Sequence, residues 1–374
     1  MSELSYTVTI NGQAWGEDQL RRIEYDRTLH VLHELKLLGV PIMDGEVELS
    51  DIDINWLEPE RAKEISLATR DGLGEEGFLR VYADVLADSA RRWKGWAATY
   101  DPAKVNWAQI ELEAHGVGFP ETMSIIGGAA SQHDALATNP EHYVIIGDID
   151  SGQRGAEAFG MFGEPVYMHG VAQESLPDGM PFQPDESYPV RLFGEMATKD
   201  DDTNFHVGAL HQFRPTADGF QVKSVFVAPG DSPQAIAIGH QVHFALEIIN
   251  SMTIAYAKKQ ADEAEDAALM SAAPTGEASA VDGTWNVEAR GRQGVLTLKA
   301  DGDVLTGHVS VIGIEADIAD GQLNGSNFTG TIEAEGPAGK VKAKLSGSVD
   351  GDALTGALKV GIIKTKLTGT RATA

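Results

Sequence analysis

The sequence contains no cysteine. Disulfide bonds, thiolate catalysis and cysteine-ligated zinc sites are therefore excluded. The N-terminal segment has no basic region followed by an apolar stretch, so no secretory signal is expected. No apolar run approaches the roughly 18 residues that a membrane-spanning helix needs. We therefore expect a cytoplasmic protein that does not enter a membrane.

Basic side chains are scarce. The 374 residues include 29 Lys and Arg against 56 Asp and Glu, for a formal net charge of -27. Nucleic acid and anionic membrane surfaces carry the same sign and are poor partners. Hydrophobic residues make up 42% of the chain, which is sufficient for large cores. The length of 374 residues indicates two or three folded domains.

The charge is distributed unevenly along the chain. Residues 281–374 hold 11 acidic and 10 basic side chains, which leaves -26 of the net charge on residues 1–280. Residues 258–280 begin as a charged helix end and continue as small residues with Pro274 and Gly276, a composition typical of linkers. We therefore predict an α+β domain over 1–257, a helix end and linker over 258–280, and a glycine-rich β domain over 281–374.

The C-terminal segment repeats a short motif. DGDVLTG begins at Asp301, DGDALTG begins at Asp350, and NGSNFTG begins at Asn324. Each motif is a two-residue turn signal followed by alternating residues, which predicts a β-hairpin. We expect about eight short antiparallel strands that form a small all-β barrel.

Helices precede strands in the first part. Pro59 marks the start of one helix, and another helix with a mainly apolar face is predicted over about Glu75–Trp93. The further segments predicted are a strand at 6–10, a helix at 18–38, strands at 109–116, 142–148, 165–171, 188–196, 205–214 and 220–227, and a long helix at about 232–268. This order indicates an α+β fold in which the long helix closes an antiparallel sheet, as in helix-grip or START-like proteins.

The long helix carries a polar stripe. His240, His243, Glu247 and Asn250 fall at i, i+3, i+7 and i+10, within one narrow sector of the helix, and apolar residues cover most of the rest. The stripe therefore faces either a solvated edge or an internal cavity. If it faces a cavity, the i, i+4 spacing of His243 and Glu247 suits a shared Zn²⁺ or another divalent cation, and His240 and Asn250 line the pocket.

Other polar residues of the sheet region are candidates to complete such a site. His206 and His211 are five residues apart on one predicted strand, so they face opposite sides and one at most points inward. Asp148 lies in a carboxylate-rich turn after an apolar strand. Three interpretations of it are open: a cation ligand, a group that moves protons, and an ordinary turn residue. A cluster of aromatic residues begins at the end of the helix predicted over about Glu75–Trp93, and three interpretations of it are open: the lining of an apolar pocket, an interface, or, as the favoured one, core packing. Its members are Trp93, Trp96, Tyr100 and Trp107.

Residues 205–250 resemble the end of the diacetylphloroglucinol-hydrolase family. The resemblance lies in HQFRPTADGFQVKSVFV, beginning at His211, and in the helix with His243-x-x-x-Glu247 that follows. It implies a START-like fold and a zinc ion that serves cleavage of a carbon–carbon bond beside an aryl ketone. It also implies that His243 and Glu247 ligate the zinc, together with a histidine and a glutamate upstream.

Three functional hypotheses follow. The first is a metal-dependent hydrolase or lyase for a small, largely apolar or aromatic carbonyl compound, with His243, Glu247 and either His142 or His169 at the metal and with His211 or Asp148 moving protons. The second is a metal-free isomerase or hydratase that uses the same stripe as acid and base. The third is a small-ligand-binding protein without catalysis, whose β domain serves association, including self-association.

Overall fold

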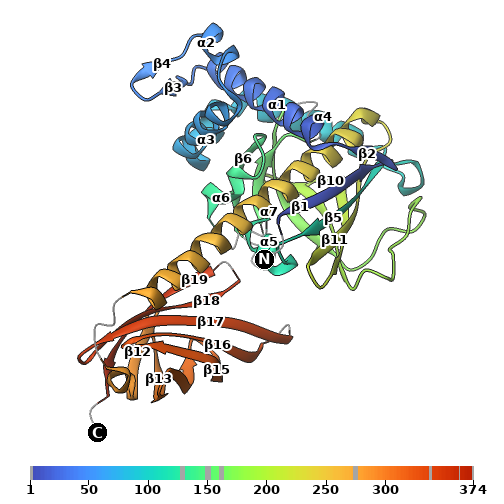
Figure 1. The fold of residues 1–374 in the computed structure, drawn as a ribbon. Coiled ribbons are helices and arrows are strands. Elements are labelled where there is room, and N and C mark those ends of the chain that lie inside the picture. The colour runs from blue at the N-terminus through green and yellow to red at the C-terminus, as the bar shows by residue number, and fades with distance from the viewer. Residues whose placement is uncertain are drawn as a thin grey trace. The chain divides into compact units, whose positions relative to one another are not determined.

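The computed structural model describes residues 3–126, 131–147, 153–159, 164–272, 277–336, 339–361 and 363–372. The chain divides into two compact units, Met1–Tyr256 and Ala257–Ala374, and the division falls within helix α7 (Gln234–Ser271) (Figure 1). Among the described residues, no helix is both long and apolar enough to cross a lipid bilayer.

The first unit combines helices with antiparallel strands. Besides the start of α7, its helices are α1 (Glu17–Leu37), α2 (Asp51–Asn55), α3 (Pro59–Val81), α4 (Ala83–Ala97), the 3₁₀ turn η1 (Pro102–Lys104), α5 (Phe119–Ile126) and α6 (Gln132–Ala137). Its strands are β1 (Ser5–Ile10), β2 (Gln13–Trp15), β3 (Met43–Asp44), β4 (Val47–Glu48), β5 (Asn106–His115), β6 (His142–Ile146), β7 (Arg154–Glu157), β8 (Val166–Gln173), β9 (Val190–Thr198), β10 (Asn204–Pro215) and β11 (Gly219–Ala228).

Nine of these strands form one sheet, in the order β2-β1-β5-β11-β10-β9-β8-β7-β6. All neighbours in the described part of this sheet run antiparallel. The strands β3 and β4 form a separate hairpin. The α+β class and the antiparallel sheet expected from the sequence are thus confirmed.

Helices α1 and α3 pack against β6 through a buried aromatic group. The ring centroids of Phe78 and Tyr82 lie 4.5 Å apart, and Tyr143 of β6 lies 5.1 Å from each of them. Both tyrosine hydroxyls donate to one Glu34 carboxylate oxygen, at 2.9 and 2.8 Å. Buried hydroxyls require such partners, and this shared acceptor fixes β6, the strand that carries His142.

Helix α7 lies along the sheet. The side-chain amide of Gln241 donates to the carbonyl oxygen of Ala108 on β5 at 2.6 Å and to that of Ser224 on β11 at 3.3 Å. Gln241 is fully buried, as are many apolar residues of the same helix. One face of α7 is therefore held on β5 and β11, and residues 239–246 and 248–252 of this helix are buried.

The helix predicted over Glu75–Trp93 is wrong in its extent. The segment belongs to two helices that meet at Tyr82, whose φ and ψ of -95° and 10° are non-helical. Gly74 also interrupts the regular helix, with φ 60° and ψ -177°. The apolar pattern of 75–93 continues across Tyr82, and periodicity alone does not reveal such a break.

The second unit is a closed barrel in its described part. After the end of α7 and the 3₁₀ turn η3 (Ala278–Val281), eight antiparallel strands follow in chain order, and the last pairs with the first. They are β12 (Gly283–Ala289), β13 (Arg292–Asp301), β14 (Val304–Val311), β15 (Ile314–Asn324), β16 (Asn327–Gly336), β17 (Gly339–Asp350), β18 (Ala353–Val360) and β19 (Ile363–Arg371). The predicted small β-barrel is confirmed.

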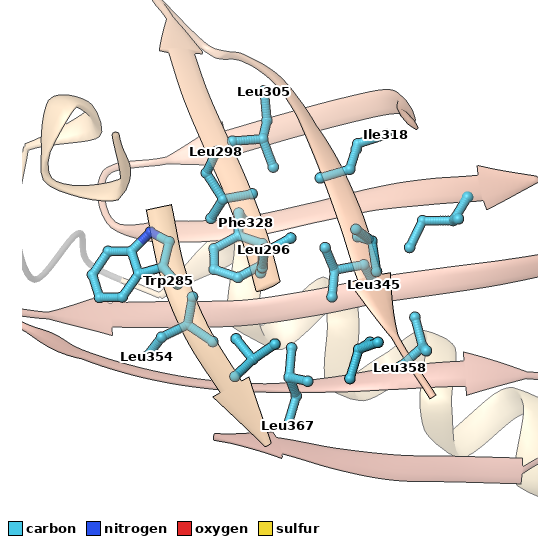
Figure 2. Packing of buried hydrophobic residues seen from close by; sticks show 14 of the residues in the cluster. Trp285, Leu296, Leu298, Leu305, Ile318, Phe328, Leu345, Leu354, Leu358 and Leu367 are labelled. Atoms are coloured by element: carbon cyan, nitrogen blue, oxygen red, sulfur yellow. The ribbon is translucent and has the colours of Figure 1, made fainter. Parts of the chain in front are cut away.

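Alternating apolar residues fill the barrel. Trp285 and Phe328 are fully buried among leucines, valines and isoleucines from every strand (Figure 2). The indole nitrogen of Trp285 donates to the carbonyl oxygen of Val281 at 3.0 Å, so the large ring is buried without an unpaired donor. The interior of this barrel is a packed core.

The repeated motif forms the barrel's tight turns. Gly302, Gly325 and Gly351 each have φ near 60° and occupy the first position of a two-residue hairpin loop. Glycine adopts this backbone conformation without steric cost, which explains why each copy of the motif has glycine at its second position.

An acidic row on the end of α7 pairs with lysines of the barrel. Lys344, Lys359 and Lys364 lie side by side on β17, β18 and β19. The ammonium group of Lys359 lies 3.2 Å from Asp262 and 3.1 Å from Asp266, and that of Lys344 lies 2.7 Å from Asp266. These acids offset the repulsion among the three lysines within the second unit.

Candidate metal centre

Three of the four stripe residues on α7 are buried. His240, His243 and Asn250 are 9%, 1% and 5% exposed, and Glu247 is half-buried. The stripe therefore faces the interior of the first unit rather than a solvated edge. Imidazole and carboxylate groups in this setting require polar partners or a bound cation.

Two histidines and a glutamate converge at this point. His142 of β6 and Glu157 of β7 are direct partners in the antiparallel ladder, so their side chains share one face of the sheet. The Nε2 atom of His142 lies 3.0 Å from Nε2 of His243 and 3.4 Å from a carboxylate oxygen of Glu157. The same oxygen lies 3.8 Å from His243 Nε2.

These separations suit ligands of one small cation. Metal–nitrogen bonds of about 2.0–2.1 Å in tetrahedral geometry place neighbouring ligand atoms roughly 3.3 Å apart. One potential ligand atom from each of His142, Glu157 and His243 lies within 4.8 Å of the others, and the distances above bracket the tetrahedral value. The three side chains fit a divalent cation such as Zn²⁺.

The remote nitrogen of each imidazole faces an oxygen. His142 Nδ1 lies 2.9 Å from the carbonyl oxygen of Ala135 and 3.1 Å from the hydroxyl of Thr138. A carbonyl oxygen only accepts, so Nδ1 carries the proton and Nε2 presents its lone pair to the cluster. His243 Nδ1 lies 3.8 Å from the carboxylate of Glu141, which is ion-pair range and longer than a hydrogen bond. Such outer partners orient metal-ligating histidines.

The turn before β6 is held from two helices. Arg70 of α3 is buried and donates to the carbonyl oxygens of Leu136 at 3.0 Å and Asn139 at 3.1 Å, and also to that of His142. The side-chain amide of Asn139 donates to the carbonyl oxygen of His243 at 3.0 Å. The backbone that presents His142 is thereby connected to the backbone that presents His243.

Charges at the cluster influence one another strongly. Burial opposes ionisation of Glu157, but His142, His243 and His240 outweigh it and lower the pKa of this carboxyl to about 2. Burial also opposes the charge on His142, but Glu157 and Glu247 outweigh it and raise the pKa of this imidazole. Burial raises the pKa of Glu247 in spite of the neighbouring histidines.

A cavity of about 160 Å³ adjoins the cluster. His142, Glu157 and Glu247 lie in its wall, together with His211 and His240. Most of the remaining lining is apolar and includes Met123, Ile126, Phe159, Leu192, Met196, Val207, Phe213, Phe226 and Phe244. This combination of a few polar groups and many apolar ones is typical of small-molecule sites.

His211 lies on the sheet side of this cavity. Its Nδ1 shares a hydrogen bond of 2.9 Å with the hydroxyl of Ser224, and its ring lies 4.5 Å from that of Phe244. Burial lowers the pKa of His211 to about 4, so its imidazole is neutral at pH 7. His206 of the same strand is not part of the cavity wall; its Nδ1 lies 3.4 Å from Glu195. Only one of the two histidines thus lies at the cavity, but His206 lies at a β-bulge with φ 53°, where the regular alternation assumed for this strand is interrupted.

No protein-family model matches the chain. No curated protein matches it either.

Some solved structures show remote likeness. A fatty acid binding protein of Schistosoma mansoni in complex with arachidonic acid is 16% identical over 26% of this chain and 100% of its own, with a TM-score of 0.20. Lipid binding protein 8 of Caenorhabditis elegans is 7% identical over 26% and 99%, with a TM-score of 0.21. DynU16, a protein of the dynemicin biosynthetic locus, is 10% identical over 71% and 87%, with a TM-score of 0.24. At these scores, none of the likenesses bears on what the chain does.

The structure brings together most of the residues that the sequence suggested. His142 and His243 meet in the cluster, and Glu247, His240 and His211 line the adjoining cavity. Asp148 lies outside the described residues.

Two of the suggested residues lie elsewhere. His169 pairs with Arg154, three residues before Glu157, so His169 and Glu157 face opposite sides of the sheet. The imidazole of His169 instead lies 3.5 Å from Asp202. Asn250 donates to Glu24 at 2.6 Å and to the carbonyl oxygen of Thr138 at 2.9 Å, so it joins α7 to α1 rather than lining the cavity.

Sequence reasoning missed Glu157. It lies on the four-residue strand β7, whose sequence Arg-Gly-Ala-Glu has no apolar alternation that predicts a strand. The available signal was the spacing from His142, because a hairpin between the two segments places them opposite each other.

Proposed function

We propose that this chain is a metal-dependent hydrolase or lyase that acts on a small, largely apolar or aromatic carbonyl compound. The supporting observation is that His142 Nε2, His243 Nε2 and a Glu157 carboxylate oxygen lie as far apart as the ligand atoms of one bound cation do, and that they lie beside a largely apolar cavity. Glu247 is the proposed fourth ligand, since it lies one helical turn from His243 and in the wall of that cavity.

The proposal extends to the fold. We propose that α7 closes the sheet in a helix-grip arrangement, supported by the hydrogen bonds of Gln241 to β5 and β11. The resemblance of residues 205–250 to the diacetylphloroglucinol-hydrolase family agrees with this arrangement. His142 and Glu157 are of the residue types expected for the upstream ligands of that family.

Each residue has a role in the proposed chemistry. A bound divalent cation would polarise a carbonyl oxygen or lower the pKa of a water molecule. His211 holds or moves a proton at Nε2, because its Nδ1 is engaged with Ser224 and its ring is neutral at pH 7. Phe213 and Phe244 orient an apolar ring and exclude water from the site.

Metal analysis of the purified protein tests this function. We expect about one zinc or similar ion per chain after reconstitution and dialysis, and a small fraction of that in His142→Ala, Glu157→Ala and His243→Ala, because each removes one ligand. The matched control is His169→Ala, which removes a histidine from the opposite face of the sheet and should retain the ion. Retention of the ion by all three cluster variants would exclude this site.

A second function is favoured by one contact. The 3.0 Å distance between the two Nε2 atoms also fits a hydrogen bond, in which Nε2 of His243 carries a proton and donates to the lone pair on Nε2 of His142. We propose as the alternative a metal-free isomerase or hydratase that uses this pair as acid and base. Full activity of the metal-free wild-type protein, together with loss of activity in His142→Ala, would support the alternative. Ligand binding without turnover in both states would instead indicate a binding protein.

A further inference from the structure

A second cavity shares one wall residue, Phe159, with the first. It has a volume of about 260 Å³ and lies between α4 and the start of α7. Trp93, Trp96 and Ile236 form apolar parts of its wall. Arg92 and Glu164 form an ion pair at its rim, where their side chains are 47% and 40% exposed. This cavity therefore has an apolar interior and a polar end toward solvent.

Phe159 lines both cavities. Phe159 is 3% exposed, and its ring centroid lies 5.3 Å from that of Trp93, which lines the second cavity. The same ring lies 6.0 Å from Phe226 and 5.8 Å from His240, which belong to the wall of the first cavity. Phe159 follows Glu157 by two residues, so the residue between the cavities is also directly connected to the cluster.

The size of the first cavity limits what it can hold. A dry engineered cavity of about 150 Å³ accommodates benzene, and the first cavity has about 160 Å³. It therefore fits one aromatic ring with short substituents. A ligand with a longer apolar tail needs further space, and the tryptophan-lined cavity is the adjoining space that the shared residue Phe159 closes off.

We propose that Phe159 determines the upper size limit of the ligand, and that the cavity lined by Trp93 and Trp96 is an extension that accepts an apolar tail once the Phe159 ring is removed. The proposal rests on the proposed function for the position of the carbonyl end, at the cluster of His142, Glu157 and His243. It assigns to Phe159 a role in specificity, without contact to the reacting atoms.

A ligand series tests the proposal. The probes are acetophenone and its 4-ethyl, 4-butyl and 4-hexyl derivatives, and the dissociation constants are measured by titration calorimetry on the full-length protein with zinc and with EDTA. For the wild type we expect affinity to fall from the ethyl to the butyl compound. For Phe159→Ala we expect affinity to rise by roughly fourfold per buried methylene up to hexyl, the factor that corresponds to apolar burial.

Phe213→Ala is the matched control. Phe213 lines the first cavity and is as buried as Phe159, but it is not part of the wall of the second cavity. Removal of the Phe213 ring creates similar space but opens no second cavity, so the gain in affinity with tail length should stop within one or two methylenes. Phe159→Leu retains more of the core and should give an intermediate profile if the alanine variant does not fold.

The outcomes separate the two proposals. Equal length profiles in wild type, Phe159→Ala and Phe159→Leu would overturn the role of Phe159, while metal-dependent binding of acetophenone would leave the proposed function intact. A longer accepted tail in the Phe159 variants with no effect of EDTA would support the size limit and oppose the metal site. Absence of binding to every probe in every variant would overturn both.

Discussion

Arg70 is buried, and one nitrogen of its guanidinium donates to the backbone carbonyls of Leu136, Asn139 and His142, from the end of α6 to the start of β6. Burial lowers the pKa of this guanidinium to about 10, which leaves it charged at pH 7. The charge stabilises three carbonyl groups that are remote from water. Arg70 therefore determines where the His142 backbone lies, although its side chain does not enter the cluster.

Replacement of Arg70 should destabilise the protein and weaken metal binding. We expect Arg70→Met to lower the free energy of unfolding by about 2–4 kcal/mol, because buried carbonyls lose a charged donor. Because Arg70 holds the backbone that presents His142, its replacement should also weaken metal affinity by roughly 10-fold or more. Denaturant titration and calorimetry measure the two effects. Exposed Arg61→Met is the control and should change stability by less than about 1 kcal/mol; equal effects of both substitutions would contradict the prediction.

His211 makes stability depend on pH. Its folded pKa of about 4 lies below the ordinary value of about 6.5 because the imidazole is buried. Between these values the unfolded chain binds a proton that the folded chain does not bind. The contribution of His211 to stability is therefore complete above pH 6.5 and is lost as the pH falls toward 4.

Substitution of His211 should remove this part of the pH dependence. The free energy of unfolding should fall between pH 7 and pH 4.5 in both proteins, and the fall should be smaller in His211→Phe than in the wild type by an amount on the order of 1–2 kcal/mol. Urea unfolding at several pH values measures the difference. Phe213→Leu, a change at a neighbouring cavity residue without a titratable group, should retain the wild-type slope. If the free energy of unfolding of His211→Phe depended on pH as steeply as that of the wild type, His211 would not be the source of this pH dependence.

At the scale of elements, the barrel depends on the last residue of its repeated motif. A Cβ atom at Gly356 would lie 2.5 Å from the carbonyl oxygen of Ser346 on β17, and one at Gly307 would lie 2.1 Å from that of Thr297 on β13. Both distances are shorter than any ordinary contact, and the obstacles are backbone atoms. These glycines permit close approach of neighbouring strands.

Gly356→Ala should therefore destabilise the second unit. We expect a loss of about 2–3 kcal/mol, because either β17 or β18 must shift within a closed barrel. Gly351→Ala is the comparison, since a Cβ atom there has no neighbour within 4 Å and only the positive φ is unfavourable. It should cost about 1–2 kcal/mol. Thermal unfolding measures both variants, and a smaller effect at Gly356 than at Gly351 would contradict the packing argument.

At the scale of the whole molecule, the two units have separate cores. The barrel's buried cluster consists of residues of the second unit. All four proposed ligands belong to the first unit. Metal binding should therefore not require the barrel.

A chain that ends at Ser271 tests this independence. It retains all of α7 and should bind about one ion with an affinity within roughly threefold of the full-length value, because the ligand set and its outer partners are unchanged. Metal titration followed by mass spectrometry measures the stoichiometry. The same truncation with His243→Ala is the control and should not bind. Loss of the ion in the truncated chain alone would show that the barrel contributes to the site.

The sequence by itself determined local features. The spacing of His240, His243 and Glu247 placed them on one side of a helix, since helical geometry depends on sequence separation alone. The repeated turn motif determined the hairpins of the barrel for the same reason, because two-residue loops require particular residues at particular positions.

Only the tertiary structure decided which of these residues meet. Whether the stripe on α7 faced water or a cavity depended on what packs against the helix, and the choice between His142 and His169 depended on strand register. A shift by one residue moves a side chain to the other face of a sheet, and periodicity does not fix that register. Glu157 entered the cluster because β7 pairs with β6 at His142. The ligand set is thus a property of pairing between segments, which local sequence patterns do not encode.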